Sequence, residues 1–455
     1  SVDHNSQIAE SNEKNNVVAT SDGIEIKPPI GTMETTVLWK YPQVSDSGVT
    51  VAPLQDSNQD GVIGAGDIAS VIVFKGGQYY VINGKTGQYE FSMSGFGSQQ
   101  LAAIGNVDAD ALPEIVIPAL DGLRIYSNKG VLKKTIPAAL TASGWATDSF
   151  HPILADLNQD GRAEIMMNDK IFNYDQGLIK NALPSGNSQA VADVDGDGLP
   201  EIIGEAGVSR SDGQKLYYFS PLLEFVAVGD VLGSKKPQIV GIEGSQILLF
   251  DGATGKRLAT YTAPASKGGS PVIADFDGDG IADIGLARTT RYVAMRGDGS
   301  IIWSTAIQDS SGGTGSTVFD FDGDGNSEAV HFDERFLRIY DSKTGVERIK
   351  IPNSTATAHE YPVVADVDAD GHADIVMTSG NSDGVRVISS KNKDWAATRN
   401  IWNQYSYHVT NINDDLSIPQ FEKNSWEVHN TYRANWLPTN SVAAADLTAS
   451  LIQIE

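Results

Sequence analysis

The sequence predicts an all-β protein folded as an eight-bladed β-propeller. An aspartate-rich loop recurs eight times along the chain, at a period of roughly 45 residues. A short apolar run follows each loop, and helical periodicity is almost absent. Four short strands in about 45 residues correspond to one propeller blade. Because the fourth and fifth repeats are short, a seven-bladed ring with one aberrant unit is the alternative.

The best-formed loop lies in the stretch ADFDGDGIADIGLA, and its candidate ligands are Asp275, Asp277, Asp279 and Asp283. Carboxylates this close together repel one another unless they share a bound cation. Calcium suits this set because it accepts many oxygen ligands in a flexible shell, and Gly280 allows the sharp bend of the loop. The sequence therefore predicts a calcium loop between two strands.

Four more loops are complete, with acids or an amide at positions one, three and five and an acid at position nine. Their candidate ligands are Asp156, Asn158, Asp160 and Glu164; Asp193, Asp195, Asp197 and Glu201; Asp320, Asp322, Asp324 and Glu328; and Asp366, Asp368, Asp370 and Asp374. An EF-hand closes at position twelve and lies between helices, whereas these loops lie between predicted strands. We therefore expect them to fasten blades rather than to sense calcium.

Three loops depart from this pattern. One has an acid at position twelve, the EF-hand spacing, and its candidate ligands are Asp56, Asn58, Asp60 and Asp67. Another has Asn first and Ala111 in place of glycine, and its candidate ligands are Asn106, Asp108, Asp110 and Glu114. The third begins at Asp230 but has Leu232, Ser234 and Gln238 at ligand positions, so we expect it to hold no ion.

The remaining parts of each repeat predict two outer strands joined by a tight turn. Each of these repeats has an apolar segment, such as Leu123–Tyr126 in the second repeat, and a tight turn follows it. Asn83–Gly87 is such a turn in the first repeat, and several of the turns end in Thr-Gly. A final glycine with positive φ explains that ending. The early segment around Trp39 resembles the fourth-strand segment around Trp303. We therefore expect this early strand to pair with the last blade and close the ring.

The five complete loops resemble the FG-GAP or VCBS repeats found in integrin α-subunit propellers, in a fungal seven-bladed lectin and in many bacterial surface proteins. The resemblance covers residues 31–394, roughly the whole predicted propeller. It implies that the calcium ions are mainly structural and that they join two strands of a blade. Because propellers host unrelated functions, it does not identify a ligand.

Residues 395–440 break the blade pattern and are rich in aromatic side chains. One interpretation is a sugar or peptide platform, since flat rings beside polar groups suit stacking and hydrogen bonding. The candidate ligand-binding residues are Trp395, Trp402, Tyr405, Trp426, His429 and Tyr432. The other interpretation, which we favour, is a cap whose aromatic residues pack against one face of the propeller.

The two ends of the chain predict neighbouring modules. Residues 1–30 resemble the end of an immunoglobulin-like "cell-adhesion-related domain found in bacteria", and residues 441–455 resemble a linker and the first strand of another. A disordered tail and an ordinary last strand are the alternatives. We expect the chain to be one processed piece of a larger polypeptide, whose neighbouring domains are its partners.

The amino-acid composition excludes several classes of partner and of chemistry. The formal net charge of -25 argues against binding to nucleic acid or anionic membrane, and no apolar run is long enough for direct membrane insertion. The chain has no cysteine, which excludes thiolate chemistry. Many acidic loops without cysteine suit a secreted or bacterial cell-surface protein, where calcium is abundant.

No enzyme motif of the G-x-S-x-G or HExxH kind is present. Arg296-Gly297-Asp298, the tripeptide that integrins bind, falls where a hairpin turn is expected. We therefore expect non-catalytic adhesion, or binding to a glycan or a protein surface. The alternatives are a structural spacer and a polysaccharide lyase for uronate polymers, for which Arg399, Lys423 and Arg433 are the basic residues near the aromatic ones.

Overall fold

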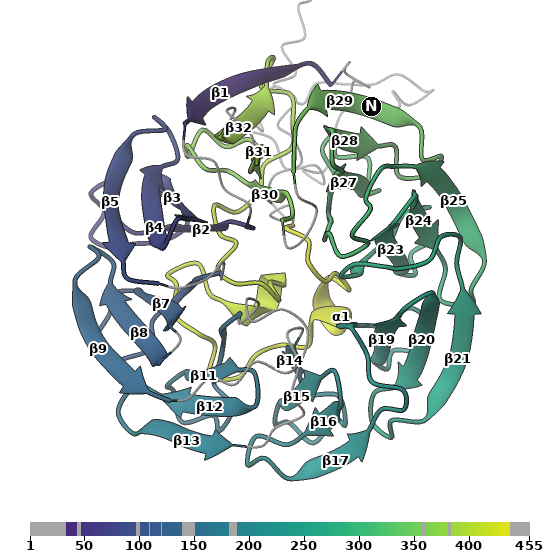
Figure 1. The fold of residues 1–455 in the computed structure, drawn as a ribbon, viewed down its shortest axis with the longest axis horizontal. Coiled ribbons are helices and arrows are strands. Elements are labelled where there is room, and N and C mark those ends of the chain that lie inside the picture. The colour runs from purple at the N-terminus through teal and green to yellow at the C-terminus, as the bar shows by residue number, and fades with distance from the viewer. Residues whose placement is uncertain are drawn as a thin grey trace, which may run out of the picture.

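Eight four-stranded sheets form a ring, and each sheet is one blade (Figure 1). This computed structural model describes residues 33–436 except 43–46, 97–100, 109, 120, 139–150, 182–188, 356–359 and 381–383. The prediction of an all-β propeller with eight blades is confirmed, and the seven-bladed alternative is wrong. The terminal stretches 1–30 and 441–455, for which we expected neighbouring modules, lie outside the described residues.

Consecutive strands pair antiparallel within each blade, from the central channel to the rim. The strands of blades one to four are β2 (Thr50–Pro53), β3 (Ala69–Lys75), β4 (Gln78–Asn83) and β5 (Tyr89–Ser94); β6 (Ala103–Gly105), β7 (Glu114–Ala119), β8 (Gly122–Ser127) and β9 (Leu132–Pro137); β10 (Ile153–Ala155), β11 (Glu164–Met167), β12 (Lys170–Asn173) and β13 (Gly177–Asn181); and β14 (Ala190–Ala192), β15 (Glu201–Gly204), β16 (Gly207–Ser209) and β17 (Lys215–Tyr218).

Blades five to eight follow the same order. Their strands are β18 (Phe225–Gly229), β19 (Gln238–Glu243), β20 (Gln246–Asp251) and β21 (Arg257–Thr262); β22 (Val272–Ala274), β23 (Asp283–Arg288), β24 (Arg291–Met295) and β25 (Ile301–Ala306); β26 (Thr317–Phe319), β27 (Glu328–Phe332), β28 (Phe336–Tyr340) and β29 (Glu347–Pro352); and β30 (Val363–Ala365), β31 (Asp374–Met377) and β32 (Val385–Ser390), with β1 (Thr35–Tyr41) completing blade eight.

The burial of the strands explains the apolar runs in the sequence. Second strands such as β7 and β23 are buried at every position, because neighbouring blades cover both of their faces. Continuous apolar sequence is what such a strand requires. Fourth strands such as β9 and β21 consist mostly of exposed and partly buried residues, since they form the rim. Most of the core therefore lies in the inner three strands of each blade, with buried aromatic residues of the fourth strands such as Trp39 and Trp303 added to it.

Strand β1 closes the ring, as the sequence predicts. It pairs antiparallel with β32, with Trp39 opposite Val387, so the first strand of the chain is the outermost strand of the last blade (Figure 1). The Trp39 ring then packs on Gly87 in the β4–β5 hairpin of blade one. Closure removes the open end that a linear array of blades would expose.

Fourth-strand aromatic residues join several neighbouring blades in the same way. Each donates from its ring nitrogen or hydroxyl to a carbonyl oxygen in the hairpin of the next blade, and the pairs are Trp39 with Gly84, Tyr217 with Gly252, Tyr261 with Gly297, and Trp303 with Ser342. The hairpins present a glycine with positive φ to the ring, such as Gly345 with φ +66°. A Cβ on Gly345 would lie 2.5 Å from the Trp303 ring, so only glycine fits there.

The C-terminal segment, residues 395–436, lies across the central channel (Figure 1). It contains one 3-10 turn, η2 (Val409–Asn411), and one short helix, α1 (Ser425–Val428). Both are far shorter than a membrane span, and no helix in the described part of the chain is long and apolar enough to cross a bilayer. The rest of the segment is extended or turned and hydrogen-bonds to the blades.

Each inner strand presents an edge to the channel, whose N–H and C=O groups need partners. The C-terminal segment provides a partner for every blade through its main chain and through short polar side chains. The contacts, from blade one to blade eight, join Val51 to Trp402, Ile104 to Asn403, Leu154 to Gln404, Gln189 to Ser406, Asp230 to Asn430, Ile273 to Tyr432, Thr317 to Arg433 and Val364 to Asn435. The segment therefore acts as a hub for the ring.

Candidate metal loops and ligand cavities

The aspartate loops connect the first strand of each blade to the second. In blade six, Asp275 follows β22 and its carboxylate accepts hydrogen bonds from the main-chain N–H groups of Gly278 at 2.7 Å and Gly280 at 2.8 Å. Gly280 has φ +85°, which lets the chain turn back towards β23. The first aspartate therefore holds the loop in its turned shape by accepting these hydrogen bonds, and the loop lies between two strands as the sequence predicts.

The acid at position nine closes each loop from the start of the second strand. In blade six, one carboxylate oxygen of Asp283 accepts a hydrogen bond from Phe276 N–H at 3.0 Å, so the other oxygen is left to face the loop. The same bond recurs in other blades, where the donor and acceptor residues are Val107 and Glu114, Leu157 and Glu164, Val194 and Glu201, Phe321 and Glu328, and Val367 and Asp374.

The closing acids are electrostatically strained without a cation. Burial, together with the charges of neighbouring aspartates, raises the pKa of Asp283 to about 7 and that of Glu201 to about 8. Among the described residues, oxygens of Glu201, Asp322 and Asp374 are buried without a hydrogen-bond partner. Orphaned anionic oxygens aimed into a loop of oxygen donors are what a hard metal ion would satisfy.

Five blades bring acidic side chains close enough to share one metal ion. In each group, one ligand atom per residue lies within 4.8 Å of the others, and the groups are Asp108, Asp110 and Glu114; Asp193, Asp195 and Asp197; Asp275, Asp277 and Asp279; Asp320, Asp322 and Glu328; and Asp366, Asp368 and Asp374. Four of these belong to loops that the sequence predicts as complete. The fifth belongs to the irregular loop of blade two.

The complete loop of blade three has the same backbone shape with a neutral third position. Asp156 accepts hydrogen bonds from Asp160 and Gly161, as the first aspartate does elsewhere. The amide of Asn158 donates to the closing Glu164 at 3.3 Å. Burial raises the pKa of Glu164 to about 7. The loop therefore has the predicted backbone shape, but the amide of Asn158 turns its nitrogen towards the closing acid and uses its oxygen for Asp160 N–H.

The loop of blade one differs at its closing acid. Asp56 shapes its first part through hydrogen bonds from Asp60 and Gly61. Asp67 is buried, and its two oxygens accept main-chain N–H groups, from Ser57 at 2.7 Å and from Gly64 at 3.0 Å. Position twelve of this EF-hand-like spacing therefore caps the loop instead of presenting both oxygens to an ion.

In blade five, an amide fills the place of the closing acid. The oxygen of Gln238 accepts the hydrogen bond from Val231 N–H, while its nitrogen donates to Ser234 Oγ at 3.0 Å and to Lys236 O at 2.6 Å. The group that faces the loop is thus a donor, which repels a cation. These bonds give a physical reason for the expectation that the Asp230 loop holds no ion.

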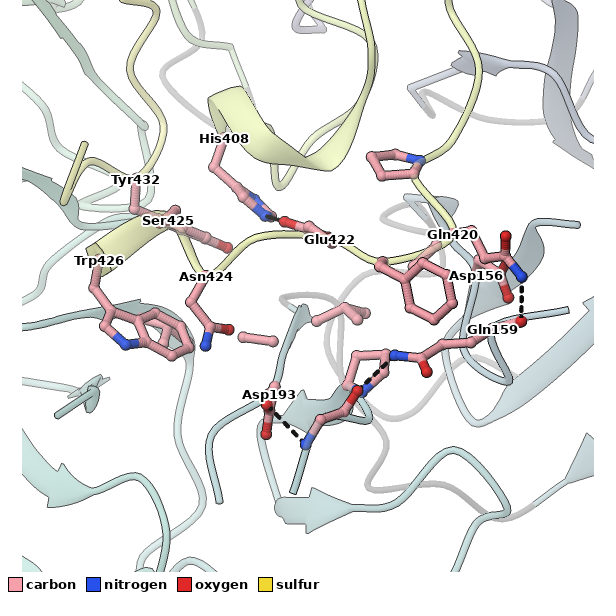
Figure 2. Close-up of a pocket in the computed structure, with 18 residues that line it drawn as sticks. Asp156, Gln159, Asp193, His408, Gln420, Glu422, Asn424, Ser425, Trp426 and Tyr432 are labelled. Atoms are coloured by element: carbon pink, nitrogen blue, oxygen red, sulfur yellow. Dashed lines mark hydrogen bonds and ion pairs between the residues drawn. The ribbon is translucent and has the colours of Figure 1, made fainter. Parts of the chain in front are cut away.

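A small cavity of about 150 Å³ lies between the C-terminal segment and blades three to five (Figure 2). His408 Nε2 pairs with the carboxylate of Glu422 at 2.6 Å, and its Nδ1 lies 3.0 Å from Ser406 O. Burial alone lowers the pKa of His408, but the charge of Glu422 and its hydrogen bond outweigh burial and leave that pKa raised. Trp426 and Tyr432 line the same cavity.

A larger cavity of about 620 Å³ lies beside the loop of blade eight, between Asp366 and the C-terminal segment. His429 and Trp436 form an aromatic pair at its wall, with ring centroids 4.1 Å apart. Lys423 is exposed at the same wall, and no carboxylate of the described residues pairs with it. We call this space the blade-eight cavity. It combines flat rings, a cation and a loop that can hold a metal ion.

The structure separates the six predicted ligand-binding residues. Trp395 and Trp402 are 2% and 0% exposed and belong to the core. Tyr405 is also buried and stacks with His151 at 4.3 Å. Packing covers these three rings, which corrects the idea of a platform on them and favours the cap interpretation. Of the six, only His429 lines the blade-eight cavity.

The three basic residues near the aromatic ones, Arg399, Lys423 and Arg433, differ in their exposure and hydrogen bonding. Arg399 donates to Val409 O and Ile412 O, both at 2.9 Å, and Arg433 is 1% exposed between the rings of Tyr361 and Tyr405. Lys423 alone among the three is exposed. Sequence reasoning did not single out Trp436 as a ligand-binding residue, although it is the aromatic partner of His429. Only their distance in space could identify that pair.

Arg296-Gly297-Asp298 forms the hairpin between β24 and β25, as expected for a turn. The carboxylate of Asp298 accepts the N–H of Ser300 at 2.8 Å, and Gly299 has φ +91°. Arg296 pairs with Asp277 of the adjacent loop. The tripeptide is therefore part of the blade.

At the sequence level, no protein-family model matches the chain. No curated protein matches it either. Solved structures do resemble its fold. The biofilm matrix protein Bap1 of V. cholerae has a TM-score of 0.78 at 19% identity, covering 89% of this chain and 99% of Bap1.

Two rhamnogalacturonan lyases are similar over a smaller part. The PL11 enzyme of Bacillus licheniformis has a TM-score of 0.56 at 18% identity, covering 76% of this chain and 71% of the enzyme. The exotype lyase YesX has a TM-score of 0.58 at 16% identity, covering 78% of this chain and 75% of the enzyme. At these identities the likeness concerns the fold.

Proposed function

We propose that the chain is a non-catalytic, calcium-stabilised adhesion module of an extracellular or bacterial cell-surface protein, of the FG-GAP or VCBS repeat type, and that it binds a glycan in the blade-eight cavity. The observation that carries the proposal is the pairing of His429 with Trp436 beside the exposed Lys423. Flat rings stack on the apolar faces of sugar rings, and polar groups around them fix the orientation.

The blade-eight metal loop forms part of the wall of the blade-eight cavity. Asp366 is the first candidate ligand of the blade-eight loop and also lines the cavity. The all-oxygen donor sets and the orphaned oxygens of the closing acids favour Ca²⁺ over metals that prefer nitrogen or sulfur. A bound ion would hold Asp366 and its loop in place, so glycan binding should require calcium. Extracellular fluid provides the concentrations that weak sites need.

A glycan array probed with and without calcium tests the proposal. We expect binding to a limited set of glycans in calcium, and loss of that signal in excess EDTA at a temperature where the protein stays folded. Trp436→Ala should abolish binding of the best glycan in calorimetry. Tyr218→Ala is the matched control, because Tyr218 is an exposed aromatic residue on the outer strand β17. Equal loss in both variants, or no glycan bound at all, would refute the proposal.

The second candidate is a polysaccharide lyase, favoured by Lys423 and His429 beside a possible calcium ion. In such a reaction a base removes the proton next to the uronate carboxylate, the C–O bond to the next sugar breaks, a double bond forms in the product, and the departing sugar oxygen takes up a proton from solvent. Here Lys423 or His429 would be the base, and the metal would neutralise the carboxylate. Incubation with pectin-like polymers and detection of an ultraviolet-absorbing unsaturated product tests it; no product after long incubation would leave the adhesion module and the simple spacer.

A further inference from the structure

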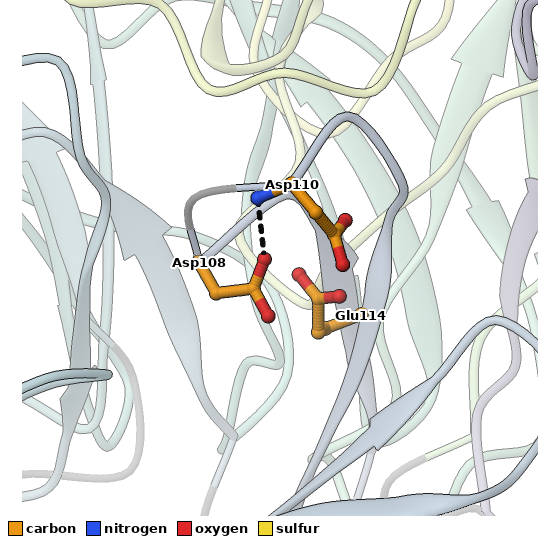
Figure 3. A group of neighbouring side chains, drawn as sticks. All are labelled: Asp108, Asp110 and Glu114. Carbon is orange, nitrogen blue, oxygen red and sulfur yellow. Dashed lines mark hydrogen bonds between the residues drawn. The ribbon is translucent and has the colours of Figure 1, made fainter.

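The loop of blade two gathers three carboxylates without the usual ligand at position one. Asp108, Asp110 and Glu114 point towards one another in Figure 3, and one oxygen of each lies within 4.8 Å of the others. Position one is Asn106, and Ala111 replaces the glycine of the other loops. Three converging negative charges need a cation, and the question is which cation this loop holds.

Lys133 provides a cation from within the chain. It lies on the outer strand β9, and its Nζ is 2.7 Å from Asp110 and 2.8 Å from Glu114. The same ammonium group also pairs with Asp108. Its side chain is 22% exposed, and that of Glu114 is fully buried. One ammonium group therefore contacts all three carboxylates that converge in Figure 3.

The side chain of Asn106 carries no charge, unlike the first aspartate of the complete loops. Its Nδ2 donates to the main-chain carbonyl of Asp110 at 2.5 Å. A carbonyl oxygen only accepts, so the atom turned towards it must be the amide nitrogen, and a protonated nitrogen does not bind a metal ion. Asn106 Oδ1 is buried without a hydrogen-bond partner. Position one therefore lacks the carboxylate of the complete loops, and its one unpaired atom is a neutral amide oxygen.

Blade seven shows what a basic residue does when the loop keeps its full acidic set. Arg348 has the place on β29 that Lys133 has on β9, and its Nη1 reaches Asp322 at 2.8 Å and Glu328 at 3.2 Å. It makes no ion pair with Asp320 or Asp324 in the described structure, and Asp322 keeps a buried oxygen without a partner. Arg348 thus leaves negative charge on the blade-seven loop without a cation partner.

We infer that the ammonium group of Lys133 is the resident cation of the blade-two loop, in the place that a metal ion takes in the complete loops, and that this blade closes without calcium. The donor set of blade two does not fit a metal ion. Its first position is neutral, and its three carboxylates already surround a positive charge. Blade two would then join blade five as a blade whose cohesion is independent of the calcium concentration.

Counting bound calcium in single-loop variants of the full chain tests the inference. We expect Asp277→Asn in blade six to lower the number of tightly bound calcium ions by about one, and Asp108→Asn in blade two to leave it unchanged. A loss of about one ion in Asp108→Asn would overturn the inference. Because neither variant removes Lys133, the result does not depend on whether a Lys133 variant folds.

Hydrogen exchange gives a second readout that needs no mutation. Addition of EDTA should accelerate exchange of main-chain amides in residues 275–283 and leave those in residues 106–114 unchanged. Where it folds, Lys133→Met should make the blade-two amides exchange faster with or without calcium, and Arg348→Met should leave residues 106–114 unaffected. EDTA-dependent exchange of residues 106–114 in the unmodified chain would contradict the inference. The glycan experiments of the proposed function do not bear on this result.

Discussion

The indole Nε1 of Trp39 donates a hydrogen bond of 2.5 Å to the carbonyl oxygen of Gly84, and this bond joins the last blade to the first. Trp303 makes the same bond to Ser342 between blades six and seven, also at 2.5 Å. The joint where the two ends of the ring meet is therefore built like a joint inside it. The N-terminal strand completes a blade and supplies the inter-blade contact as well.

Trp39→Ala should destabilise the protein by about 3 to 5 kcal/mol, the usual cost of removing a large buried aromatic side chain. Trp39 is 7% exposed, and its loss would leave a cavity over Gly87 and open the seam of the ring. Unfolding in denaturant measures the change. Trp303→Ala is the matched control and should cost a similar amount; a negligible effect of Trp39→Ala beside a large effect of Trp303→Ala would show that closure does not depend on this contact.

Removal of calcium should lower the melting temperature strongly. Each ion that binds only the folded state stabilises it by about 2.7 kcal/mol when free calcium is a hundredfold above Kd. Three loops contain an acid with an orphaned buried oxygen, namely Glu201, Asp322 and Asp374, so their losses should add up. Thermal unfolding with excess EDTA and with calcium restored measures the effect. An identical melting curve in both conditions would contradict the calcium assignment.

The His408–Glu422 ion pair should make stability depend on pH. The pKa of His408 is raised in the folded state, so its contribution is present below the unfolded value near 6.5 and is lost as pH rises through the folded value. The groups that face the imidazole are the Glu422 carboxylate, the Ser406 carbonyl and the ring of Tyr432. The free energy of unfolding, measured from pH 6 upwards, should fall, and Glu422→Gln should remove most of that slope. An unchanged slope in Glu422→Gln would refute this role.

Asn430→Ala should destabilise the protein by about 1 to 3 kcal/mol, because it leaves main-chain groups of blade five without partners. Asn430 accepts from Asp230 N–H at 2.9 Å and donates to Asp230 O at 2.8 Å. Its φ of +49° adds a cost for alanine, which adopts that conformation less readily than asparagine. Asn392→Ala, at an exposed turn, is the control for denaturant unfolding and should have little effect. Similar stability of both variants would argue against the hub.

Trp402→Ala and Trp436→Ala should separate folding from binding. Trp402 is fully buried and bonds through its main chain to Val51 in blade one, so its truncation should cost about 3 to 5 kcal/mol. Trp436 lies at the cavity wall and is only partly buried, so its truncation should cost less stability. Denaturant unfolding of both variants tests this order, and a larger loss in Trp436→Ala would reverse the assignment of the two rings.

The aspartate loops could be predicted from the sequence because their structure is local. Asp275 bonds to main-chain groups three and five residues later, and Asp283 bonds to Phe276 seven residues earlier. The tight turns are local in the same way, since Gly87 N–H bonds to Asn83 O. Short-range hydrogen bonds tie residue type to residue spacing, so the pattern can be recognised without knowing the rest of the fold.

The state of each loop could not be predicted in the same way. Lys133 reaches the blade-two loop from the fourth strand, and nothing in the spacing of residues 106–114 indicates it. Blade one shows the same limit, because Asp67 has the right spacing for a ligand but uses its oxygens for main-chain N–H groups. Which atoms face a cation is decided by contacts between strands.

By itself, the sequence determined the eight repeats, their strand and loop pattern and the closing strand around Trp39, since repeated local patterns imply repeated blades. Only the tertiary structure decided the role of the C-terminal segment. That segment has no period, and its partners, from Val51 in blade one to Val364 in blade eight, are distant in sequence. The ring places eight inner strand edges around one channel, and each edge needs a hydrogen-bond partner. The short polar side chains of the segment are such partners only in the folded ring.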